Sequence, residues 1–332
     1  MKIMMTGGAG FIGSNLLDHL LLPAFAHMVS QIVVLDNFTY AGSHANLARA
    51  VDDQRVTVVP GDICSAVLVN DLMSNVDTVL HLAAETHVDR SIADALKFIE
   101  ANVRGTYVML DAARRHRVQR FLHISTDEVY GVPEPGHRFT ENDILRPRNP
   151  YAASKAAAEL MCNSFKETFD LPLIIARSSN NVGPRQYIEK LVPRFATNAL
   201  RGLPLTVHGD GQQMRDWLYV DDNCEALALL LSDGEIGGIY NIGAHQEHSV
   251  NEVAGIILDE LCIDVPRIFV SDRPGNDRLY AIETGRMRAL GWAARHSFEE
   301  ALRRTARWYR DNPEWWSVLV ETEEHERSVP LD

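Results

Sequence analysis

The residue pair with the clearest chemical potential is Tyr151 and Lys155, which stand four positions apart in the run Tyr-Ala-Ala-Ser-Lys. This spacing places both side chains on one face of a predicted helix. A lysine ammonium beside a phenol lowers the pKa of the phenol, so that the tyrosine can act as a base near neutral pH. The pair is therefore suited to remove a proton from a hydroxyl group while a hydride leaves the same carbon atom. On its own, such a pair is usually only part of a surface helix.

A glycine-rich turn near the start of the chain predicts a site for the matching hydride acceptor. Gly7, Gly10 and Gly13 follow the first predicted strand and open the first predicted helix. Glycines at this spacing allow a tight turn and let the backbone approach a pyrophosphate at the helix N-terminus. Asp36 ends the second predicted strand, about 20 residues farther on, where a carboxylate accepts hydrogen bonds from the adenosine ribose. Such a carboxylate repels a 2′-phosphate, so the pattern favours NAD over NADP.

The first half of the chain alternates short β-branched runs with amphipathic stretches. We predict strands over 3–6, 31–36, 56–60, 76–82 and 120–125, and helices over 14–22, 65–73 and 102–115. This alternation is typical of a doubly wound α/β fold of the Rossmann type, with a parallel sheet covered on both faces. Ligands of such sheets bind at the carboxyl ends of the strands. Asp62 follows the third strand and is a candidate for contact with the adenine amino group, although a helix-capping role is almost equally favoured.

The character of the sequence changes after residue 178. Loops become longer and richer in Asn, Pro, Gly and Arg, and predicted helices over 190–200 and 251–261 are separated by irregular segments. We therefore expect residues 1–178 to form the cofactor domain with its catalytic residues. Residues 179–332 are expected to form mainly a smaller, mixed α/β lobe for the substrate, packed against the first because no low-complexity linker separates them.

Composition narrows the classes of function. The chain has 332 residues, 46% of them hydrophobic, and a formal net charge of −13. A hydrophobic share of this size supports a large core, while the acidic balance without a basic run argues against nucleic acid and anionic membranes as partners. The start of the chain lacks the pattern of a signal peptide, no apolar run is long enough to span a membrane, and the His and Cys residues lack metal-ligand spacing. We expect a cytoplasmic enzyme without a bound metal.

Over essentially its whole length, the chain resembles the extended short-chain dehydrogenase/reductase family. Within that family, the run Ser-Thr-Asp-Glu-Val-Tyr-Gly at 125–131 is similar to the signature of the dTDP-glucose 4,6-dehydratases. Further similar stretches lie at 82–91, 177–181, 209–211 and 215–217. The Asp-Glu pair after the threonine is not expected in the related epimerases and decarboxylases.

This resemblance implies a nucleoside-diphosphate-glucose 4,6-dehydratase, which oxidises C4 of the sugar, eliminates water across C5 and C6, and returns the hydride to C6. Tyr151 would then be the base for the C4 hydroxyl, tuned by Lys155, and Thr126 would hydrogen-bond the C4 oxygen. Glu128 would remove the C5 proton, and Asp127 would protonate the departing C6 oxygen. Because the net reaction is redox-neutral, NAD must stay bound throughout the cycle.

The resemblance also implies which residues surround the two ligands. The NAD site is expected to comprise the residues already named, namely Gly7, Gly10, Gly13, Asp36, Asp62, Tyr151 and Lys155, and in addition Phe11, Ile12, Asn37, Thr39, Gly42, Ile63, Leu82, Ala83, Ala84, Thr86 and Asn181. The nucleotide sugar is expected to contact Thr126 and also His87, Asn180, Glu189, Lys190, Leu191, His208, Arg215, Arg273, Asn276 and Tyr280. The two arginines are favoured because a guanidinium pairs well with phosphate oxygens. A homodimer through helices of the first lobe is implied as well.

Several positions depart from the family pattern on the nucleotide side. His208 and Val182 stand where tyrosine is usual, Asn276 stands where histidine is usual, and Val250 lies near a usual asparagine. These departures leave the redox and elimination residues unchanged and leave the nucleotide open. Thymidine diphosphate is the first choice and uridine diphosphate the main alternative.

Two other functions remain as alternatives. A 4-epimerase or a decarboxylase of a nucleotide sugar would also begin with oxidation at C4, but neither needs an acid and a base for elimination, so the pair Asp127 and Glu128 argues against both. A non-catalytic sensor that binds NAD or a nucleotide sugar would not need to keep Thr126, Tyr151 and Lys155 together with that pair.

Overall fold

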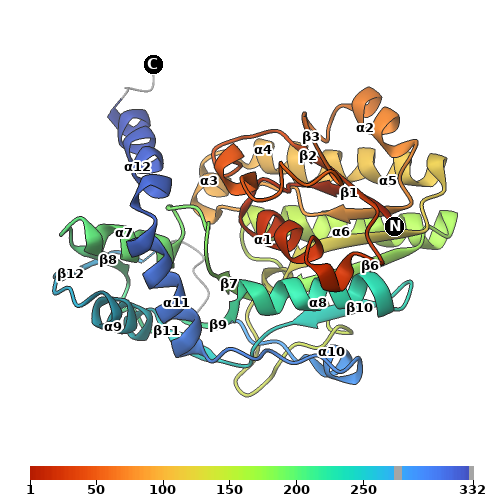
Figure 1. Cartoon of the computed structure of the whole chain (residues 1–332). Helices are drawn as coiled ribbons and strands as arrows, with labels where there is room; N and C mark the ends of the chain where they lie inside the picture. Colours follow the sequence, from red (N-terminus) through yellow and green to blue (C-terminus); the bar gives the residue numbers. More distant parts are fainter. Residues whose placement is uncertain (273–278, 329–332) are drawn as a thin grey trace.

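The computed structural model describes residues 1–272 and 279–328, with side chains up to residue 322. Its larger lobe is built on a seven-stranded parallel sheet in the order β10-β6-β5-β4-β1-β2-β3 (Figure 1). Its strands are β1 (Lys2–Thr6), β2 (Gln31–Asp36), β3 (Val56–Pro60), β4 (Thr78–His81), β5 (Arg120–Thr126), β6 (Leu173–Ser178) and β10 (Ile239–Ile242). The predicted doubly wound α/β fold is confirmed.

Helices cover both faces of this sheet (Figure 1). One face carries α1 (Phe11–Leu20) and α8 (Val220–Asp233), and the other carries α2 (Ala66–Met73), α5 (Thr106–His116) and α6 (Pro150–Phe169). Successive side chains of a strand point to opposite faces, so Ile3 and Met5 of β1 join the core with α1 and α8, whereas Met4 joins the core on the other side. None of the described helices combines the length and the apolar character needed to cross a lipid bilayer.

The predicted elements of the first half are present, with shifted ends. The strands over 31–36 and 56–60 have the predicted bounds, and the strand expected over 76–82 is shortened to Thr78–His81. The first helix begins earlier than expected, at Phe11, because Gly10 already has the extended backbone of an N-cap. A π-helical turn, Ile99–Gly105, precedes α5 and follows the short helices α3 (Val88–Ala93) and α4 (Ala95–Phe98). The sequence pattern had indicated one continuous helix over 102–115.

The smaller lobe has a core of its own, formed by helices packed on two small sheets. β7 (Asn180–Val182), β9 (Met214–Tyr219) and β11 (Glu247–Ser249) form one sheet, and β8 (Leu205–His208) pairs with β12 (Arg267–Val270). The helices are α7 (Leu191–Leu200), α9 (Val250–Leu261) and α11 (Phe298–Asp311), followed by α12 (Pro313–Ser328), while the short α10 (Gly285–Ala289) lies near β10. Phe195, Val253 and Tyr309 are fully buried in this second core.

The chain enters the smaller lobe and then returns to the larger one. Helix α8 packs against α1, where Leu16 and Leu17 share a core with Leu227 and Leu231. Strand β10 then extends the large sheet beside β6, with Asn241 opposite Arg177. The boundary between the two lobes is therefore not a single position in the sequence. Residues 220–242 follow residue 178 but lie in the larger lobe.

The strand order changes direction at β1, whose neighbours are β2 on one side and β4 on the other. The chain therefore leaves the carboxyl ends of these strands in diverging directions, and a crevice forms between the connections. Thr6, Asp36, His81 and Thr126 all end strands at this edge. The fold thus gathers the predicted chemical residues at one side of the sheet.

Candidate active site

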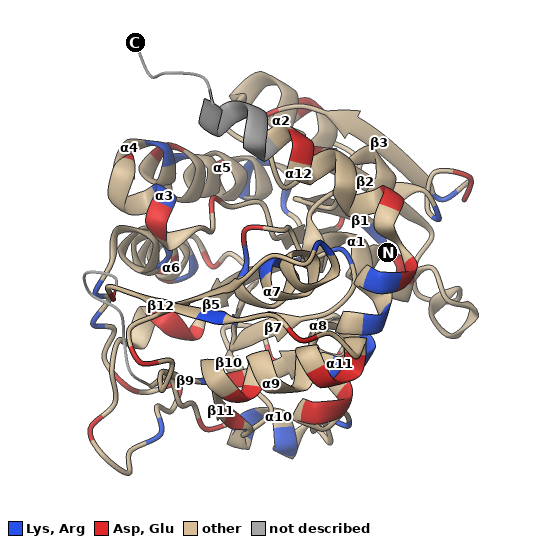
Figure 2. Cartoon of the chain, turned by 90° about the vertical axis from the view of Figure 1, so that its left-hand side faces the viewer, with Lys and Arg blue, Asp and Glu red and all other residues tan. Residues whose placement is uncertain are grey.

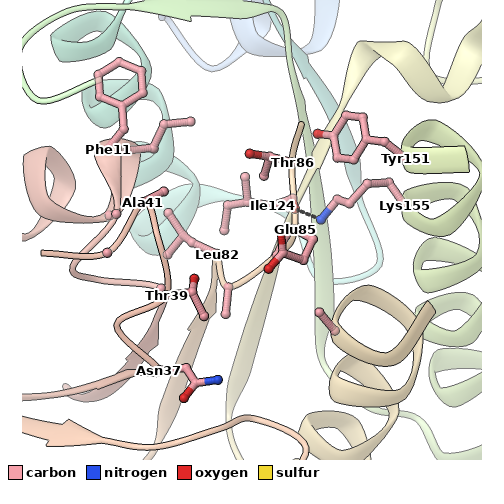
Figure 3. Close-up of a pocket in the computed structure, with 18 of the residues that line it drawn as sticks. Phe11, Asn37, Thr39, Ala41, Leu82, Glu85, Thr86, Ile124, Tyr151 and Lys155 are labelled. Atoms are coloured by element: carbon pink, nitrogen blue, oxygen red, sulfur yellow. Dashed lines mark hydrogen bonds between the residues drawn. The ribbon is translucent and has the colours of Figure 1, made fainter. Parts of the chain in front are cut away.

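A cavity of about 780 Å³ lies at this edge of the sheet. Figure 3 shows side chains from separate segments of the chain pointing into it. All residues predicted to contact the cofactor line the cavity, namely Gly7, Gly10, Phe11, Ile12, Gly13, Asp36, Asn37, Thr39, Gly42, Asp62, Ile63, Leu82, Ala83, Ala84, Thr86, Tyr151, Lys155 and Asn181. One concave space therefore brings together the glycine turn, the ends of the central strands and the Tyr-Lys helix.

The glycine turn approaches its neighbours so closely that side chains cannot be added. Gly7 has a φ of 70°, and a Cβ placed on it would lie 2.7 Å from the backbone nitrogen of Ala83. A Cβ on Gly13 would lie 2.1 Å from the carbonyl oxygen of Gly7. The turn leads directly into the N-terminus of α1, where free backbone N–H groups favour an anion. This arrangement fits the pyrophosphate of a dinucleotide.

Two acidic residues border the same part of the cavity. Asp36 accepts hydrogen bonds from the backbone N–H groups of Ala9 at 2.8 Å and Phe38 at 2.9 Å, and burial raises its pKa. Each of its oxygens keeps a further lone pair for a ribose hydroxyl. Asp62 accepts from the backbone N–H of Cys64 at 2.7 Å and does not cap α2, whose N-cap residue is Ser65. Asp62 therefore shapes the turn after β3 while lining the cavity.

Tyr151 and Lys155 both point into the cavity from the first turns of α6 (Figure 3). The helix begins at Pro150, and Asn149 caps it by accepting a hydrogen bond from the N–H of Ala152 at 2.8 Å. Both side chains are more than nine-tenths buried. The ammonium of Lys155 donates a hydrogen bond to the carbonyl oxygen of Ile124, at 2.7 Å. The cap thus fixes where the phenol stands relative to the end of β5.

The pKa of the Tyr151 phenol differs from the expectation. Burial raises this pKa, the carboxylates of Glu128 and Asp127 raise it further, and a hydrogen bond with the Thr126 side chain opposes them only in part. Burial also lowers the pKa of Lys155 to about 8. The expected lowering of the Tyr151 pKa by Lys155 is therefore wrong for the protein without cofactor. The Lys155 ammonium is bound to the Ile124 carbonyl, and the charges that act on the buried phenol come from carboxylates.

The two adjacent acids follow Thr126 in a single 3₁₀ turn, Asp127–Tyr130. The Thr126 hydroxyl donates to Asp127 and accepts from the N–H of Glu128, both at 3.3 Å. Glu128 lines the cavity and accepts a hydrogen bond from the side-chain amide of Asn149 at 3.2 Å. Asp127 is buried behind the lining, and its pKa lies well above the usual value because of burial and the neighbouring Glu128 and Asp216 carboxylates. The turn therefore presents the Glu128 carboxyl group to the cavity and keeps that of Asp127 buried, where the protonated form is favoured.

Comparison with known proteins identifies the family. The sequence model described as GDP-mannose 4,6 dehydratase matches residues 4–305. The chain belongs to this family. It is 47% identical over 315 residues to the low-salt glycan biosynthesis protein Agl12 of Haloferax volcanii, covering 95% of this chain and 100% of that protein. It is 44% identical over 321 residues to a dTDP-glucose 4,6-dehydratase of an Actinoplanes species, covering 96% and 100%.

Comparison with solved structures agrees with this family assignment. DesIV, a dTDP-glucose 4,6-dehydratase from Streptomyces venezuelae crystallised with NAD bound, matches with a TM-score of 0.93 and 44% identity. The match covers 96% of this chain and 100% of that chain. The resemblance to the extended short-chain dehydrogenases/reductases that the sequence motifs indicated is thereby confirmed.

The residues predicted for the family's nucleotide sugar are brought together only in part. Asn180, Glu189 and Lys190 line the cavity, where Glu189 accepts from Arg90 at 2.9 Å and Lys190 donates to the Thr86 carbonyl at 2.9 Å. Other predicted residues lie outside its lining, namely His87, Leu191, His208, Arg215 and Tyr280, as does the catalytic candidate Asp127. Arg273 and Asn276 fall outside the described residues.

Arg215 and Tyr280 nevertheless form a unit in the smaller lobe. The Arg215 guanidinium lies over the Tyr280 ring at 4.6 Å and donates to the Met214 carbonyl at 2.8 Å. Burial raises the pKa of Asp127, and the Arg215 charge opposes this rise to a small extent. His208 ends β8, where its ring nitrogen lies 3.3 Å from the carbonyl oxygen of Ser271. His87 accepts from the N–H of Arg90 at the start of α3.

Several polar atoms on the wall of the cavity have no hydrogen-bond partner among the described residues. These atoms are buried, and they come from the end of β5 and from the stretch 179–189: Ser125 Oγ, Ser179 Oγ, Asn180 Oδ1, Asn181 Oδ1, Gln186 Oε1 and Glu189 Oε1. Buried polar groups are costly unless they find a partner. Their concentration on one wall fits a ligand rich in hydroxyl groups, such as a nucleotide sugar.

Some lining residues were not found from the sequence. Glu85 lies in a recognised stretch but had no assigned role, and Ser125 directly precedes the catalytic threonine. Lys97 and Arg104 reach the cavity from α4 and the π-helical turn. The position of Ser125 beside Thr126 was a usable signal. Nothing in the local sequence pattern indicates that Lys97 or Arg104 reaches the site, because their approach depends on how α4 packs.

A chain of buried hydrogen bonds supports the floor of the site. Thr6 accepts from the N–H of Ala83 at 3.2 Å and donates to His81 Nδ1 at 2.8 Å. The other ring nitrogen of His81 lies 3.0 Å from the Thr106 hydroxyl, which in turn donates to the Asn102 carbonyl. This sequence of donors requires a neutral imidazole protonated on Nε2. Burial lowers the pKa of His81 to about 3.

Acidification is expected to destabilise the fold through His81. The folded-state pKa is about 3 against an ordinary value of 6.5. Its stabilising contribution is therefore complete above pH 6.5 and is lost progressively as the pH falls from 6.5 toward 3. Urea unfolding of the protein and of His81→Gln between pH 7 and pH 4 measures this, with the exposed His27→Gln as control. An equally steep loss of unfolding free energy in His81→Gln would contradict the assignment.

Proposed function

We propose that this chain is an NAD-dependent dTDP-glucose 4,6-dehydratase, which converts dTDP-glucose into dTDP-4-keto-6-deoxyglucose and water. The observation that carries the proposal is the convergence of Tyr151 with Thr126, Asp127 and Glu128 where β5 ends beside one cavity. Relatives that share 40–45% of their sequence with the chain carry the same activity in their names. An epimerase or a sensor has no use for the acid pair.

Oxidation at C4 is assigned to Tyr151, which removes the hydroxyl proton while Thr126 holds the phenol by a hydrogen bond. NAD⁺ would supply the acceptor for the C4 hydride and, once reduced, the donor at C6, and its positive nicotinamide would lower the phenol pKa. Because burial and the neighbouring carboxylates raise that pKa, Tyr151 is assigned as a base with the oxidised cofactor in place. Lys155, held at the Ile124 carbonyl, keeps a positive charge at the same end of the strand.

Elimination is assigned to the two acids. Glu128 faces the cavity and is oriented by the amide of Asn149, so it removes the C5 proton that the C4 ketone has made acidic. Asp127 is buried, which raises its pKa and favours its protonated form, so we assign it to protonate the departing C6 oxygen. The two roles require opposite protonation states, and the different burial of the two carboxyl groups supports this division.

The ligand sites follow the cavity. We assign NAD to the predicted residues that line it, with the pyrophosphate at the glycine turn and the adenosine ribose at Asp36. The carboxylate of Asp36 supports NAD over NADP because it would repel a 2′-phosphate. We assign cofactor binding and catalysis to residues 1–178, and the nucleotide sugar mainly to residues 179–332. Arg215 is assigned to its diphosphate because a guanidinium pairs well with phosphate oxygens.

The direct test is incubation of the protein and NAD with dTDP-glucose or UDP-glucose, followed by mass spectrometry and ultraviolet detection of the keto product. We expect loss of one water from dTDP-glucose. Turnover of UDP-glucose alone would show that the substrate carries uridine diphosphate instead. The departures from the family pattern at His208, Val250 and Asn276 leave this alternative open. A product of unchanged mass would indicate an epimerase, and bound NAD without any turnover would indicate a sensor.

The assignment of Glu128 makes a sharper prediction. Glu128→Gln should still oxidise C4, seen as absorbance of reduced nicotinamide, but should lose exchange of the C5 proton with solvent. We expect kcat to fall roughly 100- to 10,000-fold, the usual worth of a positioned acid or base. Asp127→Asn is the matched control, since it should keep C5 exchange and lose release of water. Unchanged turnover of Glu128→Gln would remove this residue from its role.

We also infer a homodimer. Large apolar side chains are exposed on neighbouring helices of the larger lobe, which lie side by side in Figure 2: Ile92, Leu96, Ile99, Tyr107, Leu160 and Phe169. They come from α3, α4, the π-helical turn, α5 and α6. Exposed apolar side chains on adjoining helices are typical of an interface, and a second copy of the same chain is the partner that the resemblance implies.

Dimer formation is expected to fail in Leu160→Glu, because Leu160 is 64% exposed at the centre of α6 and a buried carboxylate opposes the contact. Sedimentation velocity at micromolar protein should show a dimer for the unmodified chain and a monomer for this variant. Val67→Glu on α2, where the valine is 85% exposed, is the control and should remain dimeric. A monomeric unmodified chain would overturn the inference.

A further inference from the structure

The peptide groups of Ala9 determine the shape of the glycine turn. The glycines permit the turn but do not select it. Ala9 is fully buried, and its N–H donates to Asp36 at 2.8 Å. Its carbonyl oxygen accepts two hydrogen bonds, from the N–H of Ser43 at 3.2 Å and from the side-chain amide of Asn46 at 2.7 Å. The segment after β2 therefore holds the centre of the turn on both sides.

The amide of Asn46 is oriented in turn by the far end of the chain. Asn46 is 1% exposed, and its Oδ1 accepts a hydrogen bond from the indole N–H of Trp315 on α12, at 2.9 Å. An indole N–H can only donate, so it requires the carbonyl oxygen of the amide to face α12. The Nδ2 group is thereby directed at the Ala9 carbonyl. Without the indole donor, Oδ1 would be a buried acceptor without this partner, and the amide would lose its preferred orientation.

Neighbouring contacts keep this connection in place. The Trp315 ring packs against Trp308 and Tyr309 of α11, with ring centroids 5.0 and 6.2 Å apart. Arg185 donates to the Asn46 carbonyl at 3.1 Å and to Asp18 of α1 at 2.8 Å. The helix that follows the glycine turn, the segment containing Asn46 and the C-terminal helices are thus joined around one buried amide.

We propose that Trp315 and Asn46 are positioning residues for the cofactor site, acting through Ala9 to hold the glycine turn in its NAD-binding shape. Trp315 lies 269 positions from Asn46 in the sequence, so the C-terminal helix contributes to cofactor retention without lining the cavity. This proposal rests on the proposed NAD site. Retention matters here because the hydride taken from C4 must return at C6 before the cofactor leaves.

The test compares two phenylalanine variants of the same helix. Trp315→Phe keeps an aromatic ring and removes only the donor to Asn46. Trp316→Phe is the matched control, because it removes the indole donor to the Tyr309 carbonyl, at 2.7 Å, and leaves Asn46 untouched. We expect Trp315→Phe to release NAD roughly fivefold faster, the effect of one lost hydrogen bond, and to speed amide hydrogen exchange at residues 7–13. Trp316→Phe should leave both unchanged.

Asn46→Ala supplies an independent variant, with the same or a larger effect on both measurements. Equal changes in the two tryptophan variants would show a general loss of stability and overturn the proposal, as would no change in Trp315→Phe. If the unmodified protein binds no NAD, the proposed cofactor is wrong. In that case, hydrogen exchange at residues 7–13, measured without nucleotide, still decides whether Trp315 controls the turn.

Discussion

The geometry of the proposed active site depends on one side-chain amide, that of Asn149. Its oxygen caps α6 and so sets the position of Tyr151 in the first turn, while its nitrogen donates to the carboxylate of Glu128. One small planar group therefore positions both residues that the proposed mechanism uses for proton transfer, Tyr151 at C4 and Glu128 at C5. Pro150 strengthens the arrangement because its fixed φ suits the first helical position. An aspartate would cap the helix equally well but would place a second carboxylate against Glu128, so the position requires an amide.

The turn that carries the two acids is held at its other end by a buried ionic network. The Tyr130 hydroxyl accepts from Arg177 at 2.6 Å and donates to Asn241 at 2.8 Å. Arg177 is paired with Glu159 of α6, and both side chains are almost fully buried. The same helix therefore holds both ends of this turn, through Asn149 at its start and Glu159 farther along. Asn241 belongs to β10, so the returning strand takes part in holding the catalytic turn.

Local sequence patterns predicted the features that depend on near neighbours. Asp36 ends β2 as its spacing from Gly13 indicated, because the length of a strand–helix–strand unit is constrained by the fold. The placement of Tyr151 and Lys155 on one helical face also followed from helical geometry. The direction of the Tyr151 pKa did not, because it depends on burial of the phenol and on the nearby Glu128 and Asp127 carboxylates, which only the folded chain brings together.

Other features could not be predicted either, because they depend on contacts between segments that are far apart in the sequence. The π-helical turn places Asn102 where its amide contacts the Glu85 backbone and the Ser154 hydroxyl, two residues that lie far apart along the chain. Lys97 reaches the cavity through the packing of α4 on α6. The return of residues 220–242 to the large sheet could not be predicted, because no pattern within α8 distinguishes the face of one lobe from that of the other.

This return has a consequence for synthesis of the protein on the ribosome. Leu16, Leu17 and Leu20 of α1 share their core with residues of α8 that leave the exit tunnel only after some two hundred further residues have been made, a distance set by chain order. Until α8 has been synthesised, the apolar face of α1 lacks this partner on the nascent chain, and the smaller lobe is also incomplete. Such a face is a binding surface for chaperones. The packing of α8 on α1 thus joins the lobes in the folded protein, and it also lengthens the time for which the nascent chain needs a chaperone.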